Sequence, residues 1–317
     1  MSEKIKLPIV VGPTASGKSA LAMAIAEEIG GEIVSCDSMQ IYRRMNIGTA
    51  KPTEEEMRRV RHHMIDIVEP WESFSCADYA VRAEAAIRDI VARGKTPIVC
   101  GGTGLYLDAL LRGGMPEEAD TDEAYRCELE ALAEEKGNQY VHDLLRGVDP
   151  ESAEAIHPNN RKRVIRALEI CRVSGRKKSE IDRENSSLDG VFEPLCVGLH
   201  YADRAVLYER IERRVDQMID EGLLDEVKLL AAEGIFDRSR TAAGAIGYKE
   251  FLGYLRGECG LDEAADALKT ATRRYAKRQI TWFGAKDYVQ KIEIVGKPDA
   301  EAFKKIIKNA KKVFQFS

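Results

Sequence analysis

Short apolar runs alternate with stretches of helical periodicity in the first third of the chain. Residues 7–12 (LPIVVG), 31–38 (GEIVSCDS) and 96–102 (TPIVCGG) each read as a buried strand that ends at glycine or a polar residue. Residues 19–30 and 74–94 have the spacing of amphipathic helices, and another helix follows the third strand. Strands that alternate with helices predict a parallel sheet, with ligands beyond the carboxyl ends of its strands.

The pattern changes in the middle of the chain. Between residues 116 and 193 no segment reads as a buried strand, and residues 121–137, 139–149 and 159–175 read as helices. A strand at 193–201 and a long helix at 203–234 then follow. We therefore predict an α/β core formed by residues 1–115 and 194–317, with residues 116–193 as an all-helical insertion domain.

Composition narrows the class of protein. Of 317 residues, 44% are apolar and 32% charged, which is typical of a soluble globular chain. The seven cysteines are odd in number and form no C-x-x-C pair, so we expect reduced thiols. The first residues hold too short an apolar run for a signal peptide, and no run approaches a membrane span. These features predict a cytoplasmic protein without a membrane segment.

The first predicted turn carries a complete phosphate-binding motif, GPTASGKS. It lies between a predicted strand and a predicted helix, which makes the match specific and indicates a P-loop NTPase-like core. Backbone N–H groups of such a loop cradle anions, Lys18 adds a positive charge, and Ser19 can ligate Mg²⁺. The motif indicates a phosphate or diphosphate ligand, not specifically a nucleotide, for Gly12, Pro13, Thr14, Ala15, Ser16, Gly17, Lys18 and Ser19.

Two further polar residues follow predicted strands. Asp37 could hold Mg²⁺ or act as a general base, and its spacing alone does not separate these roles. The residues after it, Ser38, Gln40 and Tyr42, suit a nucleobase edge better than a metal. Thr103 lies in a glycine turn, where it either packs against the sheet or reaches the leaving diphosphate or a substrate base.

Two basic segments stand out in a chain of net charge −5. Residues 161–178 contain eight Lys or Arg and one acid, Glu169, while residues 269–286 contain six and no acid. The second segment also carries Tyr275, Trp282 and Phe283. Basic side chains interleaved with aromatic ones suit an RNA backbone with unstacked bases, so the two segments predict a local polyanion site.

Taken together, these motifs resemble those of the tRNA dimethylallyltransferase (tRNA isopentenyltransferase) family, in its bacterial form. The resemblance spans roughly residues 10 to 284. It rests on GPTASGKS, DSMQIYRRMNIGTAKP, HHMIDI, FSCADY, CGGTGLYLDALL, HPNNRKRVIRALEI, RIERRVDQMIDEGLLDEV, AIGYKE and KRQITWF, in the family's order.

The resemblance implies a prenyl transfer. The dimethylallyl group of dimethylallyl diphosphate would move to N⁶ of the adenosine immediately 3′ of the anticodon, in tRNAs that read codons beginning with U. It further implies Mg²⁺ as cofactor, Asp37 as the base, and Thr103, Lys18 and Arg214, rather than Arg210, near the diphosphate. We expect a monomer that binds the anticodon stem-loop.

The resemblance also implies a set of tRNA-binding residues at the sheet edge, in the insertion and in the last third of the chain. They are Asp37, Ser38, Met39, Gln40, Thr103, Arg126, Lys162, Arg163, Val164, Ile165, Arg166, Gly244, Tyr248, Lys249, Lys277, Arg278, Gln279 and Thr281. The chain departs from the family pattern at Gly244, where Gln is usual, and at Gly284, where Arg is usual. Both departures concern the expected RNA surface and leave the diphosphate motif intact.

Three alternatives share parts of this pattern. A small-molecule kinase pairs a phosphate loop with a parallel sheet, but it gives no role to the basic segments. An adenylate isopentenyltransferase acting on free AMP or ATP shares the diphosphate site, but not the helical insertion. A non-catalytic RNA-binding protein gives no role to Asp37 and Thr103 beside the loop.

Overall fold

The computed structural model describes residues 4–113, 122–184 and 190–315, which form two compact units. One unit comprises residues 1–111 and 191–317, and the other comprises residues 112–190. The domain boundary expected at 116 lies outside the described residues. The one expected at 193 falls inside a strand that begins at Phe192, so the core resumes slightly earlier than the sequence pattern indicates.

The first unit is built on a six-stranded parallel sheet with the strand order β3-β2-β4-β1-β5-β6. The strands are β1 (Ile5–Val11), β2 (Glu32–Cys36), β3 (His62–His63), β4 (Pro97–Gly101), β5 (Phe192–Tyr201) and β6 (Val289–Ile294). The four strands that the apolar runs predict are confirmed as β1, β2, β4 and β5. In the register of the sheet, Val11 and Cys36 both pair with Gly101, so these strands end side by side.

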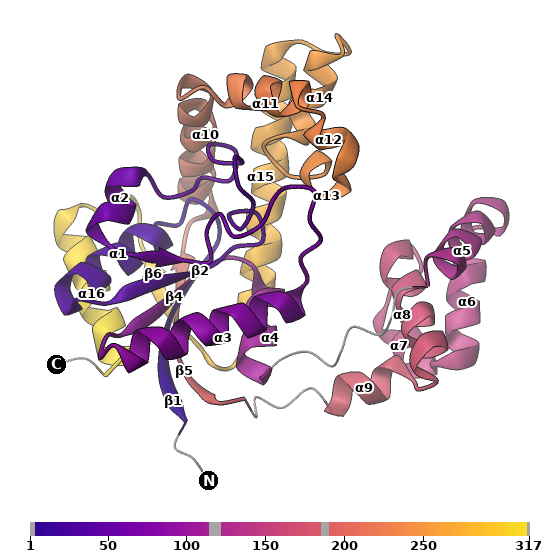
Figure 1. Ribbon diagram of the computed structural model, residues 1–317, viewed down its shortest axis with the longest axis horizontal. Helices are drawn as coiled ribbons and strands as arrows, with labels where there is room; N and C mark the ends of the chain where they lie inside the picture. Colours follow the sequence, from indigo (N-terminus) through magenta and orange to yellow (C-terminus); the bar gives the residue numbers. More distant parts are fainter. Residues whose placement is uncertain (1–3, 114–121, 185–189, 316–317) are drawn as a thin grey trace. The chain divides into compact units, whose positions relative to one another are not determined.

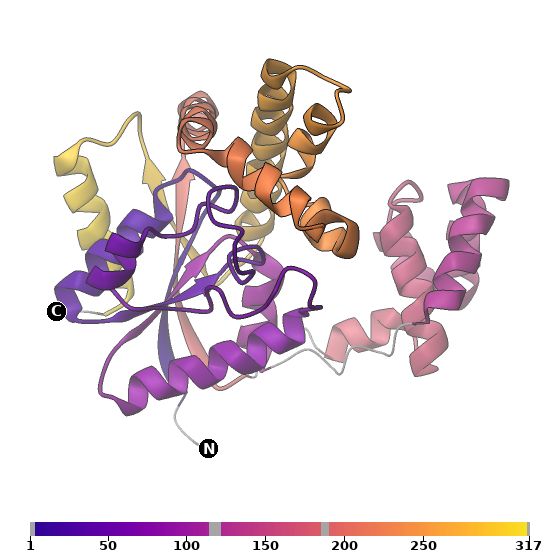
Figure 2. The same ribbon diagram turned by 45° about the horizontal axis from the view of Figure 1, so that its top comes forward.

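Helices cover both faces of this sheet. The helices α1 (Lys18–Ile29) and α16 (Ala300–Val313) pack together on one face, and α3 (Cys76–Ala92) packs on β2 and β4 from the other (Figures 1 and 2). β2 and β4 are buried along their whole length, because each lies between two strands and two helical layers. The layered parallel arrangement confirms the predicted α/β class.

The remaining helices of this unit lie before β4, after β4 and after β5. They are α2 (Glu54–Arg59), α4 (Gly104–Arg112), α10 (Arg204–Asp220), α11 (Leu223–Ala232), α12 (Ile235–Arg238), α13 (Arg240–Ala243), α14 (Lys249–Leu255) and α15 (Leu261–Gly284). The single helix expected over 203–234 is two helices, α10 and α11. Gly222 separates them with φ 100, a left-handed conformation that ends α10.

The second unit is helical throughout its described residues. It contains α5 (Glu123–Lys136), α6 (Asn138–Val148), α7 (Pro150–Ala155), α8 (Arg161–Ser174) and α9 (Lys178–Glu184). Its core includes Leu129, Val141, Leu145 and Leu168. In neither unit do the described residues include a helix long and apolar enough to cross a membrane.

One buried carboxylate joins two helices of this second unit. Asp149 caps α7 and accepts hydrogen bonds from the backbone N–H and the hydroxyl of Ser152, at 3.2 and 2.6 Å. It accepts two more from the backbone N–H and the hydroxyl of Ser179, at 2.8 and 2.7 Å. The four hydrogen bonds tie the start of α7 to α9.

Candidate active site at the carboxyl end of the sheet

The phosphate-binding loop connects β1 to α1, as the motif predicts. Gly17 precedes the first turn of α1 with φ 93, a conformation that glycine adopts without steric cost. Lys18 opens the helix, and its Nζ lies 3.4 Å from the carbonyl oxygen of Pro13. The hydroxyl of Ser16 is buried and has no hydrogen-bond partner among the described residues. A helix N-terminus with unpaired donors and a lysine is suited to bind an anion.

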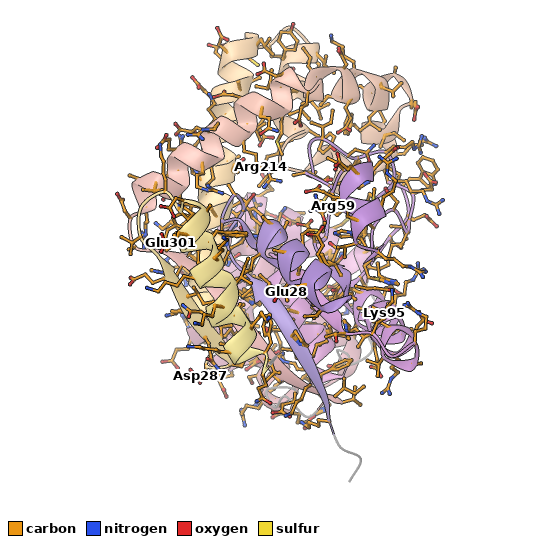
Figure 3. All side chains as sticks on the ribbon, turned by 90° about the vertical axis from the view of Figure 1, so that its left-hand side faces the viewer. Glu28, Arg59, Lys95, Arg214, Asp287 and Glu301 are labelled. Atoms are coloured by element: carbon orange, nitrogen blue, oxygen red, sulfur yellow. The ribbon has the colours of Figure 1, made fainter. Side chains whose placement is uncertain are left out.

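A second cation, Arg214 of α10, lies near Lys18. Burial lowers the pKa of Lys18, and the nearby charge of Arg214 lowers it further, while Cys100 and Asp37 oppose the shift. Burial also lowers the pKa of Arg214, with Asp37 acting in the opposite direction. Figure 3 shows Arg214 on the side of α10 that faces the phosphate loop and α1.

Neither of these cations forms an ion pair within the described parts of the chain. Two half-buried positive charges that lie near each other without a carboxylate partner are unfavourable. An anion with several charges, such as a diphosphate, would relieve this cost.

Arg210, one helical turn before Arg214, has a different contact. Its Nε donates a 2.9 Å hydrogen bond to the carbonyl oxygen of Ala15, and its guanidinium lies 6.0 Å from the ring centre of Tyr201. The side chain therefore supports the backbone of the phosphate loop.

A cavity of about 780 Å³ opens beside the loop. Lys18, Ser19, Arg210 and Arg214 line one part of it, and the segment 46–54 lines another. Ser19 also contacts the thiol of Cys100, which belongs to β4. The Ser19 hydroxyl fits the expected Mg²⁺, because Mg²⁺ in phosphate sites takes few protein ligands and completes its shell with phosphate oxygens and water. No cluster of three or more His, Cys, Asp or Glu suited to a metal occurs in the described regions.

Asp37 follows β2 and has one well-defined set of contacts. Its Oδ1 accepts hydrogen bonds from the backbone N–H groups of Met39 at 2.9 Å and Gln40 at 3.4 Å. Its Oδ2 has no hydrogen-bond partner among the residues that the structure describes. The turn thus fixes the carboxylate and leaves one oxygen for a substrate proton.

Thr103 joins the ends of β2 and β4. Its Oγ1 accepts a 3.0 Å hydrogen bond from the Ser38 backbone and donates one of 3.3 Å to the Ser38 hydroxyl. The side chain of Tyr275, which belongs to α15, forms a hydrogen bond with the Thr103 hydroxyl. Burial, and then the charge of Asp37, raise the pKa of Tyr275, while the hydrogen bond with Thr103 lowers it. The sequence placed Tyr275 in a basic segment expected to bind RNA, and it did not predict the contact with Thr103 or the closeness to Asp37, because nothing local connects these residues.

Gln40 is held at both ends of its side-chain amide. Its Oε1 accepts a 2.9 Å hydrogen bond from the Ser35 hydroxyl, and its Nε2 donates to the carbonyl oxygens of Thr49 at 3.3 Å and Ala50 at 3.0 Å. Gln40 thereby anchors the segment that lines the cavity, and it also lines the cavity itself. Its expected contact with RNA stays a prediction.

Gln279 also has an internal role in place of the expected RNA contact. Its side chain is buried, accepts a 2.8 Å hydrogen bond from the Thr14 backbone, and donates one of 3.0 Å to the carbonyl oxygen of Gly102. A Cβ at Gly102 would lie 2.0 Å from the Gln279 Nε2, so a larger residue there would displace the Gln279 amide. Gln279 therefore links the phosphate loop to the turn that carries Thr103.

Tyr248 is likewise buried, which corrects its expected contact with RNA. Its side chain is fully buried, and its hydroxyl donates a 2.8 Å hydrogen bond to Glu226. The neighbouring Gly244 and Lys249 are exposed, and the Lys249 Nζ lies 3.7 Å from Glu250.

The basic segment on α15 is partly neutralised. Lys269 pairs with Asp216 at 2.6 Å, Arg273 pairs with Glu212, and Lys286 pairs with Asp108 at 2.6 Å. Lys277, Arg278 and Thr281 are exposed, and the described residues provide no ion pair for either cation. The free positive charge is therefore confined to the middle of the segment.

In the helical unit, Val164 and Ile165 are buried in the core of α8 and its neighbours. Their side chains pack against other helices, which corrects their expected contact with RNA. Arg126 and Arg166 both bind the fully buried Glu169, at 2.8 and 2.5 Å.

Lys162 and Arg163 behave differently from these arginines. Both are exposed on α8, and neither has an ion-pair partner in the part of this unit that the structure describes. Only these two members of the expected set in this unit are therefore both exposed and unpaired.

Comparisons with known proteins show which family this chain resembles in sequence. The model of the IPP transferase family matches residues 40–286. A tRNA dimethylallyltransferase of Bacillus licheniformis is 51% identical over 282 residues, which cover 88% of each chain. The tRNA dimethylallyltransferase of Thermoanaerobacter sp. strain X514 is 46% identical over 90% of this chain and 91% of its own.

Solved structures of tRNA-modifying transferases are also similar to this chain. The tRNA isopentenylpyrophosphate transferase of Bacillus halodurans matches with a TM-score of 0.72 and 44% identity, over 98% of this chain and 97% of that one. A eukaryotic dimethylallyltransferase acting on tRNA matches with a TM-score of 0.80 and 28% identity, over 99% and 80%.

Proposed function

Because the chain belongs to the IPP transferase family, we propose that it transfers the dimethylallyl group of dimethylallyl diphosphate to tRNA. The acceptor is N⁶ of the adenosine immediately 3′ of the anticodon, in tRNAs that read codons beginning with U, and diphosphate is released. The observation that carries this proposal is the closeness of the Asp37 carboxylate, at the carboxyl end of the sheet, to the two half-buried cations of the phosphate loop and α10, Lys18 and Arg214.

The phosphate site supports departure of the diphosphate. As the allylic C–O bond breaks, negative charge grows on the leaving oxygens, and Lys18, Arg214 and the loop N–H groups stabilise it. Arg210 keeps the loop in place through Ala15. Mg²⁺, with Ser19 as its protein ligand, would neutralise further charge on the diphosphate.

The carboxylate of Asp37 supports the second half of the reaction. The N⁶ amine of adenine is a weak nucleophile, because its lone pair is delocalised into the ring. As the new N–C bond forms and the C–O bond breaks, the amine must lose a proton, which Asp37 accepts at Oδ2. The turn through Met39 holds this carboxylate in place, and Thr103 lies beside it.

The adenosine must leave the anticodon loop to reach this site, so the base is extruded from its stack. The exposed, unpaired cations Lys162, Arg163, Lys277 and Arg278 would bind the backbone of the anticodon stem-loop. We propose that the protein acts in the cytoplasm as a monomer.

A two-acceptor assay tests the proposed function. Purified protein, Mg²⁺ and radiolabelled dimethylallyl diphosphate are incubated either with total tRNA or with AMP and ATP. Label in tRNA alone, at the adenosine next to the anticodon, supports the proposal. Label in free nucleotide would make the protein an adenylate isopentenyltransferase, and phosphate release from ATP without any label would favour a kinase.

A further inference from the structure

Glu226 of α11 forms an unusual set of contacts with a distant segment. Its Oε2 accepts hydrogen bonds from the backbone N–H groups of Asn46 at 3.0 Å and Ile47 at 2.9 Å. Its Oε1 accepts one from the N–H of Gly48 at 3.1 Å and one from the hydroxyl of Tyr248 at 2.8 Å. One carboxylate therefore binds three consecutive backbone donors and a buried phenol.

The segment that Glu226 holds is a wall of the cavity beside the phosphate loop. Asn46, Ile47, Ala50 and Lys51 all line that cavity, together with Lys18 and Arg214. Within the described residues, Glu226 itself does not line it. Glu226 therefore does not contact a substrate in this cavity directly, and its hydrogen bonds reach the cavity through residues 46–48.

The same segment is also held by residues that follow Asp37. The Gln40 amide donates to the carbonyl oxygens of Thr49 and Ala50, and the Lys51 ammonium donates a 2.5 Å hydrogen bond to the carbonyl oxygen of Tyr42. The wall is thus held both by the turn that follows Asp37 and by Glu226.

Close packing leaves the segment little freedom to shift while Glu226 is in place. A Cβ at Gly48 would lie 2.5 Å from the ring of Tyr248, so the backbone lies directly on that ring. The Tyr248 hydroxyl is oriented by Glu226, and the same carboxylate binds the Gly48 N–H. Loss of the carboxylate would leave three backbone donors of the wall without their acceptor.

We propose that Glu226 is a positioning residue for the prenyl donor: it holds the 46–51 segment in the conformation that completes the cavity for dimethylallyl diphosphate. This inference rests on the proposed function for the identity of the donor. It assigns a role in donor binding to a residue outside the phosphate loop, and it predicts a change in KM for the donor more than in kcat.

The test uses Glu226→Gln, which preserves size but places an amide NH₂ group against backbone N–H donors. Its matched control is Asp225→Asn, the same loss of charge on the preceding residue. The Asp225 side chain is 82% exposed and contacts only Lys228 among the described residues, at 3.1 Å. Tyr248→Phe is a milder second variant, because it removes one of the four hydrogen bonds and keeps the packing.

We expect Glu226→Gln to raise the KM for dimethylallyl diphosphate about tenfold, as loss of hydrogen bonds to a charged group implies. The kcat and the KM for tRNA should stay within about threefold of the parent, and Tyr248→Phe should give a smaller rise in the same KM. Asp225→Asn should match the parent. A role limited to folding would lower the active fraction, and hence kcat, with an unchanged KM; that result would overturn the proposal.

Amide hydrogen exchange provides a readout that does not depend on catalysis. Exchange at residues 46–48 should accelerate in Glu226→Gln and stay at the parent rate in Asp225→Asn. If the parent transfers no prenyl group, the proposed function fails. The role of Glu226 is then judged by this exchange together with the dissociation constant for inorganic diphosphate, and parent-like values of both would overturn it.

Discussion

The backbone N–H of Thr14 donates a 2.8 Å hydrogen bond to the side-chain oxygen of Gln279, a residue 265 positions later in the chain. The other end of the same amide reaches the carbonyl oxygen of Gly102. One side chain of α15 thereby sets the spacing between the loop that carries Lys18 and the turn that carries Thr103. A segment that the sequence assigns to RNA binding also supports the phosphate-binding loop.

We expect Gln279→Met to lose both hydrogen bonds while it keeps the buried volume. Leaving the Thr14 N–H unpaired should lower the free energy of unfolding by about 1–3 kcal/mol. It should also lower kcat/KM for the donor, because the phosphate loop and Thr103 lose their common support. Denaturant unfolding and steady-state kinetics measure both effects. Gln290→Met, at an exposed position of β6, is the control, and equal effects of the two variants would contradict the prediction.

The variant Asp37→Asn distinguishes between two roles of Asp37, a general base and a metal ligand. The Asn side-chain oxygen can still accept the hydrogen bond from the Met39 backbone, so the turn should persist. An amide cannot take the N⁶ proton, and we expect kcat to fall by about 10²- to 10⁴-fold. The dissociation constant for dimethylallyl diphosphate should stay close to that of the parent. Weakened donor binding, with turnover restored by high Mg²⁺, would instead indicate that Asp37 is a metal ligand.

Two lysines of α15 provide a test of the RNA surface. Lys277 is exposed, and no described acid pairs with it, whereas Lys269 pairs with Asp216 at 2.6 Å. Lys277→Gln should raise the KM for tRNA and reduce the slope of log affinity against log salt by about one, as expected for a lost phosphate contact. Lys269→Gln should change neither. The same slope in both variants would show that exposure and pairing do not determine which lysines bind RNA.

The acid stability of the helical unit should depend on Asp149. Burial alone would raise the pKa of Asp149, but hydrogen bonds from Ser152 and Ser179 lower it to about 2. A carboxylate whose pKa is lower in the folded state contributes stability above its ordinary pKa of about 3.9, and the contribution disappears as pH falls toward 2.

We therefore expect Asp149→Asn to be less stable than the parent at pH 7, with the difference shrinking between about pH 4 and pH 2. Thermal melts across this range measure the effect. Asp143→Asn, which removes an exposed charge in the same unit, is the control. A difference that stays constant through the window would argue against a role for the Asp149 charge.

Local pattern predicted much of the fold and the position of the phosphate-binding loop between β1 and α1. Short apolar runs gave four strands, and Asp37 and Thr103 could be placed together because the carboxyl ends of parallel strands share an edge. β3 was missed because it has two residues, and β6 because its buried residues are separated by exposed ones and form no continuous apolar run. Such edge strands carry little hydrophobic signal.

Motif membership did not reveal which way a side chain points. Gln279 and Tyr248 belong to segments assigned to RNA, yet both are buried. The segment 269–286 contains no acid, but Glu212 and Asp216 of α10 neutralise two of its cations. The contacts of Glu226 could not be predicted from its neighbours in sequence, because its partners lie about 180 residues earlier in the chain. These relationships arise only when distant segments pack together.

The strand order has a consequence for synthesis on the ribosome. β1 lies between β4, which ends at Gly101, and β5, which begins only at Phe192. One edge of the first strand therefore stays without its neighbour until the entire helical unit has been translated. That unit is built from contacts close in sequence, so it can fold before β5 is available to pair with β1. During this interval the nascent core presents an open strand edge, the feature that makes growing chains prone to misassembly and dependent on chaperones.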